Sequence, residues 1–386
     1  MEAAEPVHEA SRLMNSFAAR TGLGSNTRPR RYLWTDAFAV CNFLGLAQAT
    51  DEQRYADLAL ELIEQVHQVL GAYHPDDPRR GWLSGLDEPE AEAHPTRGGL
   101  RIGKPLPERG ALDPFDERLE WQRDGQYFHY ATKWMHALDQ TARWTGQPRY
   151  NTWARELAKV SHDAFAYSGE NGRRMVWKMS TDLSRPLVPS MGHHDPLDGF
   201  ITCIELQATA SQLSSSGPSL EDATDDFARM MVHGNWATMD PLGLGGLLMD
   251  ASRVAQLVRL GGFDGTDLLR TLLAAALEGL QHYARQNDLR EPASRRLAFR
   301  ELGLAIGLSA LELVEHEMAQ NGTQRWQRAE IHELLSALGG YVRLSSEIQA
   351  CWLDPAHRRS PSWTEHRDIN DVMLATSLLP AGFVVL

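Results

Sequence analysis

Hydrophobic residues recur along most of this chain at spacings of three and four positions, which is the period of an amphipathic α-helix. This period predicts about twelve helical segments. They cover residues 5–19, 34–48, 52–70, 125–143, 149–166, 197–214, 219–233, 241–259, 265–285, 298–318, 326–348 and 369–378. The expected fold class is therefore all-α.

Two kinds of helix alternate in this series. One kind is apolar around most of its circumference and comprises residues 34–48, 197–210, 241–250 and 302–313. A helix of this kind is buried on all sides, whereas residues 52–70 keep a charged face that suits a peripheral position. The alternation predicts an (α/α)6 double-ring barrel in which residues 1–386 form a single domain. An open α-solenoid also alternates its helices, but six pairs close a ring with none left over, which favours the barrel.

One helical hairpin occurs twice in the sequence. The first copy contains Thr50, Arg54, Tyr55, Ala59, Leu62 and His67. The second copy contains, at one constant offset, Thr145, Arg149, Tyr150, Ala154, Leu157 and His162. A single hairpin cannot bury its own apolar face and must stack on similar units, so the repeat also predicts an array of helix pairs.

The amino-acid composition limits the kinds of molecule that this chain is expected to bind. The chain has 386 residues, of which 42% are hydrophobic and 23% charged, as in an ordinary globular protein with a large core. Its formal net charge of −13 argues against a nucleic-acid or membrane-surface partner, because both require a basic surface. Cys41, Cys203 and Cys351 are odd in number and widely spaced, so we expect buried thiols rather than disulfides or zinc ligands.

The first residues of the chain give an expectation for the cellular compartment. Residues 1–5 are acidic and lead into an amphipathic helix, which does not resemble a signal peptide. No apolar run approaches the roughly 18–20 residues of a membrane span. We therefore expect a cytoplasmic protein.

Long segments precede several of the expected inner helices. Residues 71–123 and 167–196 are the longest, and residues 286–297 and 349–368 are shorter. Residues 175–179 have a strand-like pattern. Loops of this length in a compact domain are usually functional or disordered, and their tryptophans argue against disorder. We expect the two longest loops to cover one end of the barrel over a deep pocket.

Carboxylates stand beside aromatic residues or histidines at the expected starts of the inner helices, where these loops also lie. Aromatic faces suit the C–H faces of sugar rings, and carboxylates bind hydroxyl groups or act as acid and base. The catalytic candidates are Asp124, Asp36, Asp195, His193 and His194. The candidates for substrate binding are Trp34, Trp121, Tyr127, Gln126, Trp177, Asp198, Trp236, Asp240, Trp363 and His366. The expected ligand is a neutral polyhydroxylated small molecule.

Each candidate also has a structural interpretation. The four aspartates near helix N-termini are potential caps, since aspartate is a preferred capping residue; they are Asp36, Asp124, Asp195 and Asp240. His193 and His194 are adjacent and have no partner at metal-ligand spacing. We therefore expect no metal and no other cofactor, and a histidine that acts as an acid/base group or substrate ligand.

Two further patterns are interpreted as structural. Residues 221–226 superficially resemble a diphosphate-binding aspartate motif of terpene cyclases, but they begin an amphipathic outer helix, where acidic residues stabilise the helix dipole. His67, His129 and His162 lie inside expected helices, where histidines are more often structural than catalytic.

Four segments resemble the six-hairpin glycosidase superfamily. Residues 123–127, followed by residues 133–138 and 145–150, are similar to the segment of unsaturated glucuronyl hydrolases in which an aspartate opens an inner helix. Residues 31–34 resemble the first hairpin of N-acylglucosamine 2-epimerases, which are cytoplasmic and cofactor-free. The resemblance implies an (α/α)6 barrel that acts on sugars, with Asp124 at the position of the hydrolases' aspartate.

Four functions stay open at this point. The leading hypothesis is a glycoside hydrolase, in which one carboxylate protonates the leaving oxygen while a second activates water or attacks C1. A cofactor-free sugar epimerase or isomerase would instead use a histidine to move a proton at carbon. A terpene cyclase or a non-catalytic binding protein would also suit a helical barrel, because a fold alone does not assign a function.

Overall fold

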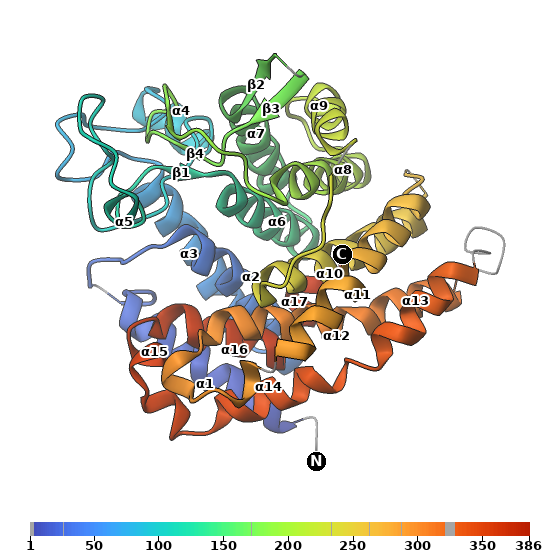
Figure 1. The fold of residues 1–386 in the computed structure, drawn as a ribbon. Helices are drawn as coiled ribbons and strands as arrows, with labels where there is room; N and C mark the ends of the chain where they lie inside the picture. Colours follow the sequence, from blue (N-terminus) through green and yellow to red (C-terminus); the bar gives the residue numbers. More distant parts are fainter. Residues whose placement is uncertain are drawn as a thin grey trace. The chain divides into compact units, whose positions relative to one another are not determined.

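The computed structural model describes residues 4–25, 27–170, 172–232, 234–261, 263–286, 288–320 and 329–386. Thirteen longer helices dominate it (Figure 1), and they are α1 (Ala4–Thr21), α2 (Leu33–Thr50), α3 (Gln53–Leu70), α6 (Phe128–Thr145), α7 (Pro148–Phe165), α8 (Asp195–Leu213), α9 (Glu221–Met231), α10 (Pro241–Leu260), α11 (Thr266–Gln286), α12 (Ala298–Gln320), α13 (Ala329–Gly339), α14 (Arg343–Leu353) and α16 (Arg367–Leu378). Short helices are α4 (Glu88–Ala93), α5 (Glu117–Glu120), α15 (Pro361–Thr364) and α17 (Ala381–Val384). The strands are β1 (Gln126–Tyr127), β2 (Ala166–Gly169), β3 (Gly172–Met175), β4 (Lys178–Met179) and β5 (Pro186–Val188).

The sequence pattern located these helices closely, with two differences. The segment expected as one helix over residues 326–348 is divided into α13 and α14, and residues 326–328 lie outside the described part of the chain. The break falls at Gly339-Gly340, because glycine is a poor helix former. Helix α14 then continues to Leu353, into the segment expected as a loop. The second difference is that α6 begins at Phe128, because β1 precedes it.

The repeated hairpin makes the same local contacts in both copies. The guanidinium of Arg54 lies 4.2 Å from the ring centre of Tyr55, and that of Arg149 lies 4.8 Å from the ring centre of Tyr150. Each arginine also donates a hydrogen bond to the hydroxyl of its tyrosine, at 2.6 Å and 2.8 Å. The sequence repeat is therefore a structural repeat.

Burial separates inner from outer helices as the pattern predicted. Most residues of α2, α8, α10 and α12 are buried, whereas α3, α7, α9 and α11 bury one face. Within the chain α6 packs on α8, α10 on α12, and α12 on α16, while α7, α9 and α11 each pack on the inner helix that precedes them (Figure 1).

Glycines allow α10 and α12 to approach closely. A Cβ atom on Gly245 would lie 2.1 Å from the carbonyl oxygen of Gly303, and one on Gly307 would lie 2.5 Å from the carbonyl oxygen of Gly245. These distances are far below a van der Waals contact. The two inner backbones therefore pack against each other without intervening side chains.

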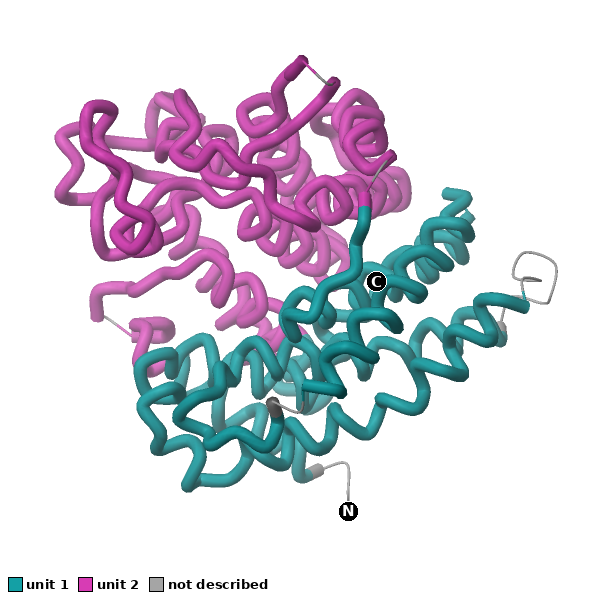
Figure 2. Tube along the Cα trace, in the orientation of Figure 1, with its two compact units in different colours: residues 1–17, 45–52, 235–386 teal, residues 18–44, 53–234 magenta. Residues whose placement is uncertain are grey.

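Contact density divides the chain into two compact units (Figure 2). Unit 1 comprises residues 1–17, 45–52 and 235–386, and contains α10 to α17. Unit 2 comprises residues 18–44 and 53–234, and contains α3 to α9 with all five strands. The single domain expected over residues 1–386 stays a prediction.

In unit 2 the two longest loops are joined to each other. Strand β1, at the end of the first loop, pairs antiparallel with β4 in the second, with Tyr127 opposite Lys178, and β4 pairs with β5. The guanidinium of Arg79 in the first loop binds Asp182 in the second at 2.8 Å. The strand-like pattern of residues 175–179 corresponds to the end of β3 and to β4. The two loops therefore lie together, as expected, while the deep pocket expected beneath them stays a prediction.

Among the described residues, no helix combines the length and the apolar character that a membrane span requires.

Candidate functional site

A row of polar pairs crosses the interface between α6 and α8 in unit 2. At its loop end, His129 Nδ1 lies 3.9 Å from Asp195 Oδ1. One turn deeper, the ammonium of Lys133 binds Asp198 Oδ2 at 2.7 Å. Residues three or four apart share one face of a helix, so the spacing of these side chains along both helices produces successive pairs.

The same row continues into the interior. His136 on α6 lies 2.7 Å from Glu205 on α8, measured from Nδ1 to Oε1. Both side chains are buried, with exposures of 2% and 0%. Deeper still, the hydroxyl of Thr209 donates to Asp139 at 2.7 Å. The pair nearest the loops is the most accessible to solvent, because the side chain of His129 is 39% exposed, compared with 18% for Lys133.

Asp195 is a carboxyl group with a strongly raised pKa at the loop end of this row. It is the first residue of α8, it is only 5% exposed, and its Oδ2 has no hydrogen-bond partner. Burial and the neighbouring Asp198 carboxylate raise the pKa of Asp195 from 3.8 to about 7, although the Lys133 ammonium opposes this shift. At neutral pH a substantial fraction of Asp195 is therefore an uncharged acid that can donate a proton.

Gly192 fixes the position of the Asp195 carboxyl group. A Cβ atom at Gly192 would lie 2.2 Å from Asp195 Oδ2, so only a glycine leaves room for the carboxyl group in its observed position. The amide of Asp195 also donates to the carbonyl oxygen of Gly192 at 3.4 Å. The loop before α8 therefore covers the carboxyl group from one side.

His129 complements Asp195. The low polarity of its surroundings, together with the Lys133 ammonium, lowers the pKa of His129. The ring stacks on Tyr127 at 5.5 Å between centroids and meets the edge of Tyr130 at 4.8 Å. A neutral imidazole in this position can accept a proton, so an acid and a base lie side by side.

Aromatic side chains pack around His129 of this pair. Tyr127 packs on Tyr130 and on Trp177, each at 5.0 Å between centroids. Trp177 in turn packs on Trp121 at 5.4 Å, and Trp34 packs on Tyr130 at 6.5 Å. Trp121 is 54% exposed, whereas Tyr127 is 2% exposed and its hydroxyl has no hydrogen-bond partner. We call His129, Asp195, Tyr127, Tyr130 and Trp177 the His129–Asp195 cluster.

Asp124 lies outside this cluster and has a structural environment. Its Oδ2 accepts a hydrogen bond from Arg101, and its Oδ1 accepts the amides of Gly103 at 3.0 Å and Gly125 at 3.1 Å. The side chain is 1% exposed. The ion pair holds the first long loop to the end of α3, because Arg101 also donates to the carbonyl oxygen of Val69. Asp124 does not open α6, contrary to expectation, and its catalytic role stays a prediction.

Asp36 also has a structural environment. Its Oδ2 accepts the amide of Tyr32 at 2.8 Å, and its own amide donates back to the carbonyl oxygen of Tyr32. Its Oδ1 lies 3.5 Å from the guanidinium of Arg31. The carboxylate therefore satisfies the backbone amide of Tyr32, the residue that precedes α2, at the N-terminal end of the helix. The capping interpretation of Asp36 therefore has direct support.

The remaining candidates in unit 2 differ in position. Gln126 has structural contacts: its side-chain oxygen accepts a hydrogen bond from the backbone amide of Leu100, and its side-chain nitrogen donates to the carbonyl oxygens of Gly98 and Thr181. His193 and His194 lie directly before α8, with ring centroids 4.6 Å apart. They therefore border the loop that covers Asp195.

Four of the residues predicted to bind substrate lie in unit 1. Asp240 caps α10 by accepting the amide of Gly243 at 3.0 Å, which confirms its capping interpretation. Trp236 is buried, and Trp363 is buried and stacks on Trp352. His366 precedes α16 and meets the ring of Phe299 at 5.9 Å.

Sequence reasoning missed His129, Lys133 and Tyr130. His129 was expected inside a helix as a structural residue, but α6 begins one residue before it, so its ring stands at the loop end. The spacing of four residues between His129 and Lys133 could have indicated that both side chains lie on the same face of α6, the face that packs on α8. His67 and His162 are structural as expected, since His67 accepts a hydrogen bond from Trp134 and His162 lies 2.9 Å from Asp226.

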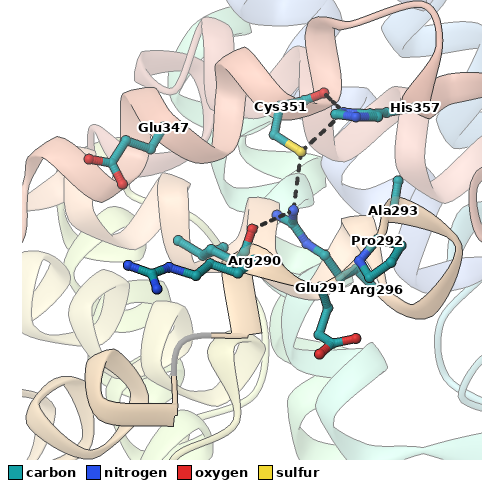
Figure 3. A pocket seen from close by; sticks show the side chains of 9 residues that line it. Arg290, Glu291, Pro292, Ala293, Arg296, Glu347, Cys351 and His357 are labelled. Atoms are coloured by element: carbon teal, nitrogen blue, oxygen red, sulfur yellow. Dashed lines mark hydrogen bonds between the residues drawn. The ribbon is translucent and has the colours of Figure 1, made fainter.

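A separate cavity of about 420 Å³ lies in unit 1 (Figure 3). Arg296 and His357 both approach the sulfur of Cys351, at 3.3 Å each. Burial nevertheless raises the pKa of the Cys351 thiol, and this outweighs the opposing effect of Arg296. Among the described residues the three cysteines are free thiols, and no group of three or more acidic, histidine or cysteine side chains is arranged to hold a metal ion.

No protein-family model and no curated protein matches the chain. Among solved structures, the GH76 α-mannanase of Bacteroides thetaiotaomicron matches with a TM-score of 0.55 at 9% identity, over 97% of this chain and 98% of that chain. A sugar epimerase from a ruminal bacterium matches with a TM-score of 0.47 at 12% identity, over 89% and 87%. The cellobiose 2-epimerase of Spirochaeta thermophila matches with a TM-score of 0.44 at 12% identity, over 95% and 97%. The mannanase match shows the (α/α)6 fold that helix alternation predicted.

Proposed function

We propose that the chain is a cytoplasmic, cofactor-free carbohydrate-active enzyme that isomerises or epimerises a sugar by proton transfer. The observation that carries this proposal is the contact of 3.9 Å between Asp195 and His129, in which a carboxyl group with a raised pKa adjoins an imidazole with a lowered pKa. Near neutral pH His129 is uncharged, and so is a substantial fraction of Asp195. Pairs of titratable groups whose surroundings move their pKa values in opposite directions are typical of acid/base sites.

The chemistry follows from these protonation states. His129 accepts the proton from the carbon next to the sugar carbonyl group, while Asp195 donates its proton to the carbonyl oxygen, which gives an enediol. Return of a proton from His129 to the neighbouring carbon, with loss of the hydroxyl proton to Asp195, converts an aldose into a ketose. General acid and base help of this kind contributes roughly 10²–10⁴-fold to a rate.

The aromatic lining supports a sugar as the substrate. Tyr127, Tyr130 and Trp177 pack around His129 of the acid/base pair, and Trp121 extends the aromatic surface outward. Aromatic faces pack against the C–H bonds of a sugar ring, while the exposed edge of His129 meets its hydroxyl groups. The buried Tyr127 hydroxyl, which has no protein partner, adds a hydrogen-bond donor to the same region.

Glycoside hydrolysis is the second candidate. It has the support of one observation, namely that Asp198 lies one turn from Asp195 on α8, so two carboxyl groups share one face. Asp195 would act as the acid, and Asp198 would activate water or attack C1. Against this, Asp198 is only 5% exposed, and it accepts hydrogen bonds from both Lys133 and Thr132.

A paired substrate screen tests the proposal. The enzyme is incubated with free aldoses, ketoses and reducing disaccharides in one series, and with aryl glycosides and oligosaccharides in the other. The proposal predicts a product of unchanged mass in the first series and intact glycosides in the second. Cleaved glycosides without any isomer would instead establish hydrolysis. In either case Asp195→Asn should abolish the activity that is found.

A further inference from the structure

A second cavity in unit 1, with a volume of about 780 Å³, is lined by an excess of positive charge. Four arginines line it, Arg12, Arg358, Arg359 and Arg367, against a single lining carboxylate, Asp371. This excess of positive charge around one cavity contrasts with the formal net charge of the whole chain, which is −13. The residues come from α1, from the segment before α15 and from the start of α16, which are distant in sequence.

The existing contacts leave part of this charge without a counter-ion. The carboxylate of Glu9 accepts hydrogen bonds from the guanidinium of Arg12, at 2.6 Å and 2.7 Å, and from that of Arg358, at 3.0 Å. Arg367 lies 3.7 Å from Asp371. Arg359 is exposed, and its guanidinium makes no hydrogen bond or ion pair with any described residue. Two carboxylates therefore face four guanidinium groups, which leaves two positive charges.

Helix α16 adds to the attraction for an anion. The twelve-residue helix begins at Arg367, and no side chain caps its N-terminus, since His366 makes no capping hydrogen bond. Arg367 and Asp371, four residues apart on α16, line the cavity together with Thr364 of α15, so the cavity lies beside the N-terminal part of this helix. The first amides of a helix lack acceptors within it and carry a partial positive charge, which favours anions.

We propose that this cavity binds a small molecule that carries a phosphate dianion. The guanidinium group matches phosphate oxygens with paired hydrogen bonds. The surplus of two positive charges matches a phosphate monoester, and the volume lies within the range of small-molecule sites. The lining includes Trp363, which is 2% exposed and gives the organic part of the ligand an apolar contact.

Isothermal titration calorimetry with glycerol 3-phosphate tests this site directly, with malonate as a dianion that lacks phosphate geometry. We expect one phosphate site per chain, at least about tenfold weaker binding of malonate, and about tenfold weaker glycerol 3-phosphate binding by Arg359→Gln. Arg343→Gln is the matched control, because it removes the same charge from a side chain that is 82% exposed on α14. It should change the affinity less than twofold.

Three results would overturn the proposal: no phosphate binding by the wild-type protein, equal affinity for malonate, or an equal effect of Arg343→Gln. Thermal melting of each variant checks folding, and Arg359→Gln should melt as the wild type does, since the Arg359 guanidinium has no partner to lose. These measurements do not depend on the proposed sugar chemistry, because they report binding alone.

Discussion

Asp195 Oδ1 lies 3.9 Å from His129 Nδ1, at the point where α8 and α6 both begin. The contact is too long for a hydrogen bond, and Asp195 Oδ2 also has no hydrogen-bond partner. A buried carboxyl group without a partner destabilises a protein when it is charged. Such an arrangement is therefore typical of a functional site rather than of a structural ion pair.

The pH dependence of turnover follows from the two pKa shifts. Asp195 must be protonated to act as the acid, so activity should fall as the pH rises through about 7. His129 must be neutral to act as the base, and its lowered pKa keeps it neutral in mildly acidic solution. We expect a bell-shaped profile of kcat/KM with a maximum on the acidic side of neutrality. A profile that rises continuously to pH 9 would contradict these roles.

Substitution of Asp195 should separate activity from stability. Between about pH 4 and pH 7 the unfolded carboxyl group loses its proton while the folded one retains it, because its pKa rises from 3.8 to about 7. The folded state therefore loses stability as the pH rises through this window. Asp195→Asn removes this cost, so the variant should be inactive yet melt at a higher temperature than the wild type at pH 8.

At pH 4 the two proteins should melt at nearly the same temperature, since the folded wild-type carboxyl group is then protonated. Asp163→Asn serves as the control, because its side chain is 53% exposed and should give no such gain. Differential scanning calorimetry at both pH values makes the comparison. A melting temperature of Asp195→Asn below that of the wild type at pH 8 would mean that Asp195 stabilises the fold.

Gly192→Ala should displace the acid without changing any charge. The added methyl group would lie 2.2 Å from Asp195 Oδ2, and the side chain must move to accommodate it. Misplacement of a catalytic group by about 1 Å costs roughly a hundredfold in rate. We expect kcat to fall by about this factor with an unchanged circular dichroism spectrum. Gly246→Ala is the control, since a Cβ atom there meets nothing within 4 Å.

Asp124→Asn should act on stability instead. Removal of one partner from a buried ion pair costs roughly 3–5 kcal/mol, and Arg101 would then be buried without its carboxylate. Chemical unfolding should show this loss, while the folded fraction keeps its turnover. Normal stability combined with a large loss of turnover would support the catalytic role that the sequence resemblance implies for Asp124.

The sequence contained most of the information about the fold. Helical periodicity located the long helices, because the spacing of hydrophobic residues in the sequence shows which faces of a helix are buried. The exception, the division between α13 and α14, depends on a Gly339-Gly340 pair that the pattern alone did not weigh. The repeated Arg54-Tyr55 and Arg149-Tyr150 contacts were also predictable as a repeat.

The site was less predictable. Asp195 was a candidate, as were Tyr127 and Trp177, because aromatic and acidic residues before an inner helix are visible in sequence. His129 was missed, since its role depends on where α6 begins and on its register with α8, which are tertiary properties. Asp36 and Asp195 have equivalent positions near helix starts. Only the structure distinguishes a carboxylate that accepts a backbone amide at its helix N-terminus from one whose Oδ2 has no hydrogen-bond partner.

The most direct test of the proposed proton transfer is deuterium incorporation from D2O, followed by NMR on the sugar that the substrate screen identifies. We expect the wild-type enzyme to place deuterium at the carbon next to the carbonyl group. We also expect both His129→Gln and Asp195→Asn to reduce this incorporation by roughly 10²-fold or more, since each removes one partner of the acid/base pair. Turnover without any carbon-bound deuterium, or full incorporation by the Asp195→Asn variant, would contradict the proposed proton transfer.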